Sequence, residues 1–376
     1  MNQALEFDLF NEHLKNNLAR LKIVNFTPIQ IQSFPTLLAR KNLIGLSETG
    51  SGKTYAYLLP ILENIKNNPK KNPSVLILAP TKELARQITE ETKKLCRNTT
   101  LLSTLILGGQ NINEQARDLK KGQHVVVGTP GRIEDLVIKE FLQLQELDYI
   151  VLDEGDTMMD MGFRAQLDHI FQAVNPNACR CLFSATLNAE VEDLIGTYIP
   201  DAMTINIDAN KSKDTIDECY LKISRKEKLD FIKFLIKKEK IKSAIIFSNT
   251  KVAAQTIYEN LKASKYQVGL IHGDLSVLER KRVIEKIKNK DISFLVATDV
   301  AARGIDISHL TSVINAEIPQ NKESYIHRIG RTGRTKKISG KSYILSEENF
   351  EEIKKLELSP KLNELKLEGY QSAHKK

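Results

Sequence analysis

The sequence is poor in cysteine and contains no long apolar run. Its four cysteines, in a chain of 376 residues, form no C-x-x-C pair. This pattern argues against a disulfide framework or a cysteine zinc site and is typical of reduced thiols in a cytoplasmic protein. No apolar stretch approaches the roughly 20 residues that a membrane-spanning helix needs. The N-terminal segment MNQALEFDLF carries acidic residues and lacks a basic start, so we expect no signal peptide.

Positive charge is in excess. Lysine and arginine number 55 against 47 aspartate and glutamate, a formal net charge of +8. Such a charge favours binding to polyanions, although a lysine-rich surface that is merely solvated is an equally open interpretation. The length exceeds that of one ordinary hydrophobic core and predicts two domains.

Short β-branched runs recur along the chain, with helical stretches between them. They lie at 42–46, 74–80, 124–130, 149–154 and 180–186, and again at 243–250, 267–273, 292–299, 311–317 and 341–346. The runs are apolar on both faces, which is typical of parallel strands covered by helices above and below. The repeated order of strand, turn and helix predicts an α/β fold, whose ligands bind at the carboxyl ends of the strands.

A polar stretch without periodicity, 208–215, divides the two series of runs. We interpret it as a linker between an N-terminal domain, 1–207, and a C-terminal domain, 216–358. The remaining residues, 359–376, alternate leucine and lysine on a short helical pattern and are expected to form a short polar tail.

The segment SETGSGKT, 47–54, follows a predicted strand and precedes a helical pattern, which is the context that a phosphate-binding P-loop requires. Its glycines allow backbone N–H groups to turn toward phosphate oxygens. Lys53 can reach the β and γ phosphates, and the Thr54 hydroxyl can hold Mg²⁺. Ser47 replaces the usual first glycine, at a position that needs only a small residue.

Three acids, Asp153, Glu154 and Asp156, follow another apolar run. In isolation they could be a surface cluster at a strand end. Beside a P-loop, Asp153 is placed to hold the metal, partly through water, and Glu154 to orient or deprotonate the attacking water.

Ordered motifs extend this pattern along the whole chain. They are TPIQ (27–30), SETGSGKT (47–54), PTKELA (80–85), the pair Gly108-Gly109, TPGR (129–132), DEGD (153–156), SAT (184–186), IIFSNT (245–250), HGD (272–274), ATDVAARGID (297–306) and HRIGRTGR (327–334). From about Phe7 to about Glu357, the chain resembles a DEAD-box ATP-dependent RNA helicase of helicase superfamily two. Gly155 stands where that family has alanine, which makes the motif DEGD.

The resemblance implies two RecA-like domains, each a mostly parallel sheet covered by helices, joined by a flexible linker. ATP would lie between them with Mg²⁺, and RNA would cross both on the opposite face. The implied reaction is RNA-stimulated hydrolysis of ATP to ADP and phosphate, coupled to local separation of short RNA duplexes. An ATP-gated RNA clamp with little unwinding is the alternative, and a P-loop ATPase acting on DNA is a third.

The resemblance also assigns roles to residues of the ATP site. Gln30 would read the adenine edge, and Phe7, or alternatively Phe10, would stack on the base. Asp306 would contact the ribose, and Arg331 and Arg334 would act as arginine fingers on the γ-phosphate. The nucleotide-binding loop comprises Thr49, Gly50, Ser51, Gly52, Lys53 and Thr54. The residues implied to couple ATP to domain closure are Asp156, Ser184, Thr186 and His327.

Loops that would grip the RNA backbone, without reading sequence, are implied in both domains. Their residues are Thr81, Lys82, Gly109, Thr129, Arg132, Gly273, Arg280 and Thr298. Two positions depart from the family. Lys82 replaces an arginine, so a single ammonium charge stands where a guanidinium could form two parallel hydrogen bonds. Val277 stands where glutamine is frequent. Beyond RNA, we expect ribonucleoprotein or RNA-processing partners, no membrane contact, a monomer and a cytoplasmic location.

Overall fold

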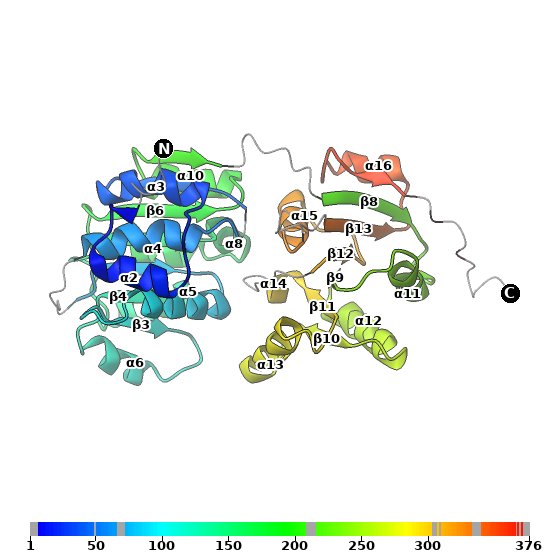
Figure 1. Ribbon diagram of the computed structural model, residues 1–376, viewed down its shortest axis with the longest axis horizontal. Coiled ribbons are helices and arrows are strands. Elements are labelled where there is room, and N and C mark those ends of the chain that lie inside the picture. The colour runs from blue at the N-terminus through cyan, green and yellow to red at the C-terminus, as the bar shows by residue number, and fades with distance from the viewer. Residues whose placement is uncertain are drawn as a thin grey trace. The chain divides into compact units, whose positions relative to one another are not determined.

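A computed structural model describes residues 7–48, 50–65, 72–207, 216–302, 307, 310–332, 340–365, 367 and 370. The chain forms two compact units, Met1–Lys211 and Ser212–Lys376. Each unit contains one sheet with helices packed against it (Figure 1). The predicted linker, 208–215, lies outside the described residues.

The sheet of the first unit is parallel throughout its described strands. These are β1 (Leu43–Leu46), β2 (Val75–Leu78), β3 (Ser103–Ile106), β4 (Val125–Gly128), β5 (Tyr149–Asp153), β6 (Cys179–Ser184) and β7 (Met203–Asn206). Their order across the sheet is β3-β4-β2-β5-β6-β1-β7.

Both faces of this sheet are buried. Val75 and Ile77 of β2 belong to one hydrophobic core, and Leu76 and Leu78 belong to another. Because successive side chains of a strand point to opposite faces, a strand between two cores is apolar at every position. One core also contains residues of α2 (Glu12–Arg20), α3 (Pro28–Leu38), α4 (Lys53–Asn64) and α5 (Lys82–Leu95). The other contains residues of α6 (Ile112–Leu119), α7 (Pro130–Ile138), α8 (Gly155–Asp160), α9 (Arg164–Ala173) and α10 (Ala189–Tyr198).

The second unit repeats this plan, again with parallel pairing between its described strands. They are β8 (Ile216–Lys222), β9 (Ala244–Ser248), β10 (Val268–Ile271), β11 (Phe294–Thr298), β12 (Ser312–Asn315), β13 (Gly340–Ser346) and β14 (Asn363–Glu364). Their order is β10-β11-β9-β12-β13-β8-β14. The helices are α11 (Lys228–Lys238), α12 (Lys251–Ala263), α13 (Val277–Lys288), α14 (Asp299–Ala302), α15 (Lys322–Ile329) and α16 (Phe350–Lys355).

The predicted α/β class, with two mostly parallel sheets, is confirmed, and every predicted run overlaps a strand. Four strands were missed: β3, β7, β8 and β14. β3 and β7 are short and partly exposed, so they lack the continuous apolar run that identifies a central parallel strand. β8 begins with two adjacent acids, Asp217 and Glu218, which interrupt the apolar run of the strand.

The helical pattern expected for the tail is wrong where the structure describes it. Asn363 and Glu364 form a strand that pairs with Cys219 and Tyr220. Leu365, Leu367 and Tyr370 then pack against the core of the second unit. The leucines therefore cover this core. No helix in the described ranges is long and apolar enough to cross a membrane.

Candidate nucleotide site and nucleic-acid interface

The order of the strands determines where each motif lies along one edge of the first sheet. The neighbouring strands β5, β6 and β1 lead into the acids, the SAT segment and the phosphate loop, while β3, β4 and β2 lead into the Gly-Gly, TPGR and PTKELA loops. Because the carboxyl ends of parallel strands share one edge, residues far apart in sequence form two adjacent groups of loops.

The phosphate loop turns through two glycines with positive φ, Gly50 at 86° and Gly52 at 96°. L side chains rarely adopt this region, so glycine is required at both positions. Lys53 is buried and its Nζ donates to the Ser47 carbonyl at 2.8 Å. The lysine thus folds back over the loop that it is expected to serve. Thr49 lies outside the described residues.

Gln30 ties the TPIQ segment to this loop. Its Nε2 donates to the Gly52 carbonyl at 3.0 Å, and its Oε1 accepts from the Thr27 backbone N–H at 2.9 Å. A Cβ at Gly52 would lie only 2.5 Å from Gln30 Nε2. The expected adenine-reading side chain therefore also supports the phosphate loop, a contact that the motif spacing did not reveal.

Burial distinguishes the two candidate stacking residues. Phe10 is 3% exposed and makes edge-to-face contacts with Phe26 and Phe34. Phe7 is only partly buried and stacks on Phe26 with ring centroids 4.4 Å apart. Phe10 is thus an anchor of the core, which leaves Phe7 as the better candidate for a base-stacking role.

Asp153 sits at the end of β5 with 3% of its surface exposed. Its Oδ2 accepts a hydrogen bond from the Tyr57 hydroxyl at 2.9 Å. Burial raises the pKa of the Asp153 carboxyl to about 6, against the opposing effect of the Lys53 charge. Burial also holds the pKa of Tyr57 well above its usual value, with a further contribution from Asp153, so the phenol is a donor at neutral pH. Tyr57 was not among the predicted site residues.

Glu154 adopts a left-handed backbone conformation, φ 56° and ψ 55°, immediately before α8. A non-glycine residue held there carries strain of about 1–3 kcal/mol, and such strain clusters at functional sites. Gly155 follows as the first residue of the helix. A Cβ at Gly155 would lie 3.0 Å from Leu182 Cδ1, so an alanine would be a tight fit at this position.

The third acid, Asp156, binds the SAT segment directly. Its Oδ2 accepts from the backbone N–H groups of Ala185 and Thr186 at 3.1 and 2.9 Å and from the Thr186 hydroxyl at 2.9 Å. The Asp156 N–H in turn donates to Ser184 Oγ at 3.2 Å. The structure thus brings together three of the four residues expected to act in coupling.

The donor set at this edge suits Mg²⁺. The ion prefers oxygen ligands and is usually held by one or two carboxylates, substrate phosphates and several waters. Thr54 is the second residue of α4, directly after the loop, and the Asp153 carboxylate lies close enough to Lys53 for their charges to interact. Among the described residues no group of three or more His, Cys, Asp or Glu side chains could hold a metal ion by itself.

In the second unit, α15 carries the first part of HRIGRTGR. The Arg331 side chain is buried, and its Nε donates to the His327 carbonyl at 3.3 Å. Asp306 and Arg334, which complete the expected ATP contacts of this unit, lie outside the described residues.

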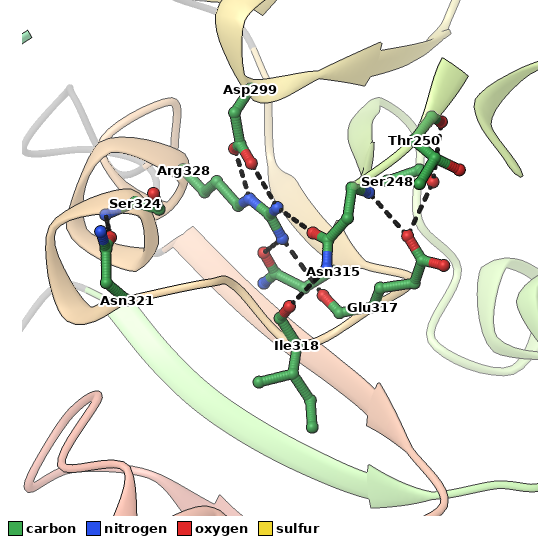
Figure 2. Close-up of polar contacts among 10 residues, drawn as sticks. Ser248, Thr250, Asp299, Asn315, Glu317, Ile318, Asn321, Ser324 and Arg328 are labelled. Atoms are coloured by element: carbon green, nitrogen blue, oxygen red, sulfur yellow. Dashed lines mark hydrogen bonds and ion pairs between the residues drawn. The ribbon is translucent and has the colours of Figure 1, made fainter. Parts of the chain in front are cut away.

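Arg328, which lies between His327 and Arg331 in the sequence, was missed as a site residue. Among the residues that the structure describes, it is the largest fully buried side chain. Figure 2 shows its guanidinium facing Asp299 and Asn315. Its donors reach both oxygens of Asp299 at 2.6 Å, Asn315 Oδ1 at 3.2 Å, the Glu317 carbonyl at 3.1 Å and Asn249 Oδ1 at 2.7 Å. All five N–H groups of the guanidinium are therefore satisfied, and Arg328 joins the ends of β9, β11 and β12 to α15.

The predicted RNA-contact residues of the first unit are brought together by their loops. Thr81 caps α5 by accepting from the Leu84 N–H. Lys82 Nζ lies 3.4 Å from the position that a Cβ on Gly109 would occupy. Thr129 is the residue preceding α7. A cation thus stands beside an open glycine backbone, an arrangement suited to a phosphate group.

Arg132 is more enclosed than expected for a residue that grips RNA. Its side chain is 12% exposed, and Nη1 donates to the Gln110 carbonyl at 2.9 Å and to Gln115 Oε1 at 3.1 Å. Gln115 Nε2 donates to the Leu107 carbonyl at 3.0 Å. Arg132 and the previously unrecognised Gln115 therefore hold the Gly-Gly loop in place.

The corresponding loops of the second unit also meet at one sheet edge. Thr298 ends β11 beside Ser248 of β9. Gly273 follows β10, where Lys251 and Asp274 form an exposed ion pair of 2.5 Å. Arg280 Nη2 donates to the Ala301 carbonyl at 2.6 Å, which links α13 to the segment after β11. Val277 is the first residue of α13.

Comparisons with known proteins agree with this arrangement. Residues 27–194 match the family model of DEAD/DEAH box helicases, and residues 227–336 match the helicase conserved C-terminal domain. The DEAD-box ATP-dependent RNA helicase CshA of Geobacillus kaustophilus is 40% identical over 335 residues, 88% of this chain and 71% of that protein. The CshA of Bacillus cereus strain ATCC 10987 is 40% identical over 312 residues, 83% of this chain.

A solved structure of S. cerevisiae Dbp5 bound to RNA and ADP BeF3 superposes with a TM-score of 0.83 at 30% identity, covering 95% of this chain and 94% of that one. The chain therefore belongs to the DEAD-box ATP-dependent RNA helicase family, and its two sheets are those of RecA-like domains. It spans 59% of the length of the Bacillus cereus relative.

Proposed function

We propose that this protein is an RNA-stimulated ATPase that couples ATP hydrolysis to local separation of short RNA duplexes. The observation that carries the proposal is the shared sheet edge of the first unit. The acids after β5 and the phosphate loop after β1 stand on one half of it, and the backbone-gripping loops after β2, β3 and β4 stand on the other. Binding of RNA can thus act on the nucleotide site through one rigid sheet.

The chemistry falls to the residues around the phosphate loop. Lys53, now on the Ser47 carbonyl, would move to the β and γ phosphates. Thr54 and Asp153 would hold Mg²⁺, which when bound neutralises phosphate charge. Glu154 would orient the attacking water and accept its proton. Gln30 and Phe7 would select and stack the adenine.

The second unit would complete the site when ATP binds. Arg331 and Arg334 would place positive charge on the γ-phosphate, where negative charge spreads in the transition state, and Asp306 would contact the ribose. Domain closure would be coupled to the bound nucleotide by four residues, Asp156, Ser184, Thr186 and His327. The network of Asp156 with the SAT segment supports this role.

RNA would be bound through its backbone by the residues of both units. Phosphate contacts of this kind position the strand without reading its sequence, and they weaken as salt rises. Lys82 in place of arginine keeps the charge but loses the two-pronged geometry. Selection of RNA over DNA would depend on contacts to the 2′-hydroxyl.

Several further features belong to the same proposal. The DEGD motif keeps the three acids of the mechanism, and its glycine removes only one methyl group. We propose a cytoplasmic monomer that acts with ribonucleoprotein or RNA-processing partners. The four cysteines are free and buried, which is compatible with a reducing compartment.

The test compares ATP hydrolysis with no nucleic acid, with RNA and with DNA of the same sequence, alongside separation of a short RNA duplex. We expect hydrolysis stimulated by RNA and ATP-dependent strand release. Stimulation by DNA alone contradicts the RNA assignment. Tight ATP-dependent RNA binding without strand release identifies a clamp instead of a duplex-separating enzyme.

A further inference from the structure

The Tyr57 hydroxyl is a buried polar group beside the reactive acids to which the proposed mechanism gives no task. Tyr57 lies four residues after Lys53 in α4, and residues at this spacing share one face of a helix. The side chain is fully buried, and its ring contacts Phe183 of β6 with centroids 5.2 Å apart. The ring is thus held against the sheet between α4 and the ends of β5 and β6.

The position of the hydroxyl follows from the strand register. β5 and β6 pair so that Asp153 lies beside Phe183, and the ring resting on Phe183 carries its hydroxyl to Asp153 Oδ2 at 2.9 Å. The neighbouring backbone N–H of Glu154 also favours the charged form of the Asp153 carboxylate. The Tyr57 hydroxyl, which comes from a different element, is therefore placed to define the orientation of this carboxylate.

We propose that Tyr57 is a positioning residue for Asp153, fixing the carboxylate so that it meets the hydrated Mg²⁺ of bound ATP in one orientation. The inference rests on the proposed function, because it assumes that Asp153 serves that ion. Partners that orient a metal-binding group affect metal affinity or activity by about 10–100-fold when they are removed. In this scheme Tyr57 does not touch the nucleotide and acts through Asp153, while the Thr54 side chain also lies within reach of its hydroxyl.

The test uses Tyr57→Phe in the full chain, which removes one oxygen atom and keeps the ring. A fluorescent non-hydrolysable ATP analogue is titrated in Mg²⁺ and in EDTA. The dissociation constant in EDTA divided by the dissociation constant in Mg²⁺ measures how much the metal strengthens binding. We expect Tyr57→Phe to lower this ratio about 10-fold, with affinity in EDTA unchanged. The Mg²⁺ concentration for half-maximal ATP hydrolysis should rise by a similar factor.

Tyr149→Phe is the matched control. Tyr149 is equally buried in the same unit, but it lies at the opposite end of β5 and its hydroxyl donates to the Leu37 carbonyl at 3.2 Å. This variant should keep the wild-type ratio even if it lowers thermal stability. The positioning role is overturned if Tyr57→Phe leaves the ratio of dissociation constants unchanged. It is also overturned if Tyr149→Phe lowers that ratio by the same factor as Tyr57→Phe.

A second comparison places Tyr57→Phe in an Asp153→Asn background. If the tyrosine acts only through the carboxylate, the exchange adds no further loss of Mg²⁺ dependence there. A further loss shows that Tyr57 acts by another route and rejects the proposal. If wild-type protein itself shows no Mg²⁺ dependence, the proposed ATP site fails as well, and the two failures are thereby distinguished.

Discussion

Asp156 and Thr186 are joined twice through a single carboxylate oxygen. Asp156 Oδ2 accepts from both the N–H and the hydroxyl of Thr186 at 2.9 Å, while Oδ1 accepts from the N–H of Thr157 at 2.9 Å. The carboxylate therefore connects the start of α8 to the segment after β6. These bonds tie the position of the SAT segment to that of the acids at the end of β5.

Thr186→Val should weaken this connection while leaving the nucleotide site intact. The exchange removes one of the two Thr186 donors to Asp156, at a cost of about 1 kcal/mol. We expect wild-type affinity for ATP and a reduced stimulation of hydrolysis by RNA. Thr186→Ser restores the hydroxyl and should recover most of the stimulation. Equal stimulation in all three proteins would show that the hydroxyl has no part in coupling.

Glu154→Gln should bind ATP and RNA but hydrolyse ATP at least 100-fold more slowly, since a general base contributes about 10²–10⁴-fold. The amide cannot accept the proton of the attacking water. Glu190→Gln, at an exposed position in the first turn of α10, removes the same charge and should leave turnover unchanged. Steady-state hydrolysis and equilibrium nucleotide binding distinguish a lost catalytic step from lost affinity.

Asp153→Asn should stabilise the protein without nucleotide at neutral pH. Because the folded-state pKa is raised from 3.8 to about 6, the unprotonated carboxylate is disfavoured in the fold. Its destabilising effect is absent below pH 3.8, develops as the pH rises through about 6, and reaches the order of 3 kcal/mol at neutral pH.

The melting temperature of Asp153→Asn should therefore exceed that of wild type at pH 7.5, by a margin that shrinks toward pH 4.5. Thermal unfolding across this range provides the measurement. A margin that is constant with pH would mean that Asp153 titrates normally in the folded protein.

Gly155→Ala should have a small net effect on stability. Alanine favours the helix by about 0.5–1 kcal/mol, but its methyl would lie 3.0 Å from Leu182 Cδ1 and 3.1 Å from Cγ. The shorter side chain of Leu182→Val should relieve this contact, so the double variant should be more stable than the two single effects predict. ATP binding should stay intact, and a large gain in basal hydrolysis would show that Gly155 restrains turnover.

Arg328→Lys should destabilise the second unit by about 3–5 kcal/mol, because an ammonium cannot reproduce five donors and leaves Asp299 imperfectly paired. Arg282→Lys, on the exposed face of α13, is the matched control and should be neutral. Differential scanning calorimetry would register the loss as an earlier unfolding transition. Similar transitions in both variants would mean that the buried guanidinium contributes little.

Much of the fold was predictable because the central strands have a recognisable sequence signal, a continuous apolar run. Within the runs 74–80 and 124–130, the strands β2 and β4 are apolar along their whole length, and both of their faces are buried. The edge strands were not predictable in this way. Met203–Asn206 is largely exposed, and Asn363–Glu364 consists of two polar residues paired with β8, so neither has a hydrophobic pattern of its own.

The sequence by itself determined the α/β class, the order of the motifs and the kinds of chemical group that each brings: glycines and a lysine for phosphate, and three acids for metal and water. Only the tertiary structure decided which side chains support these groups. Tyr57 reaches Asp153, and Arg328 reaches Asp299, across 96 and 29 positions of the chain. Such contacts depend on strand register and on the rotation of a helix against its sheet, which arise from packing and leave no local pattern in the sequence.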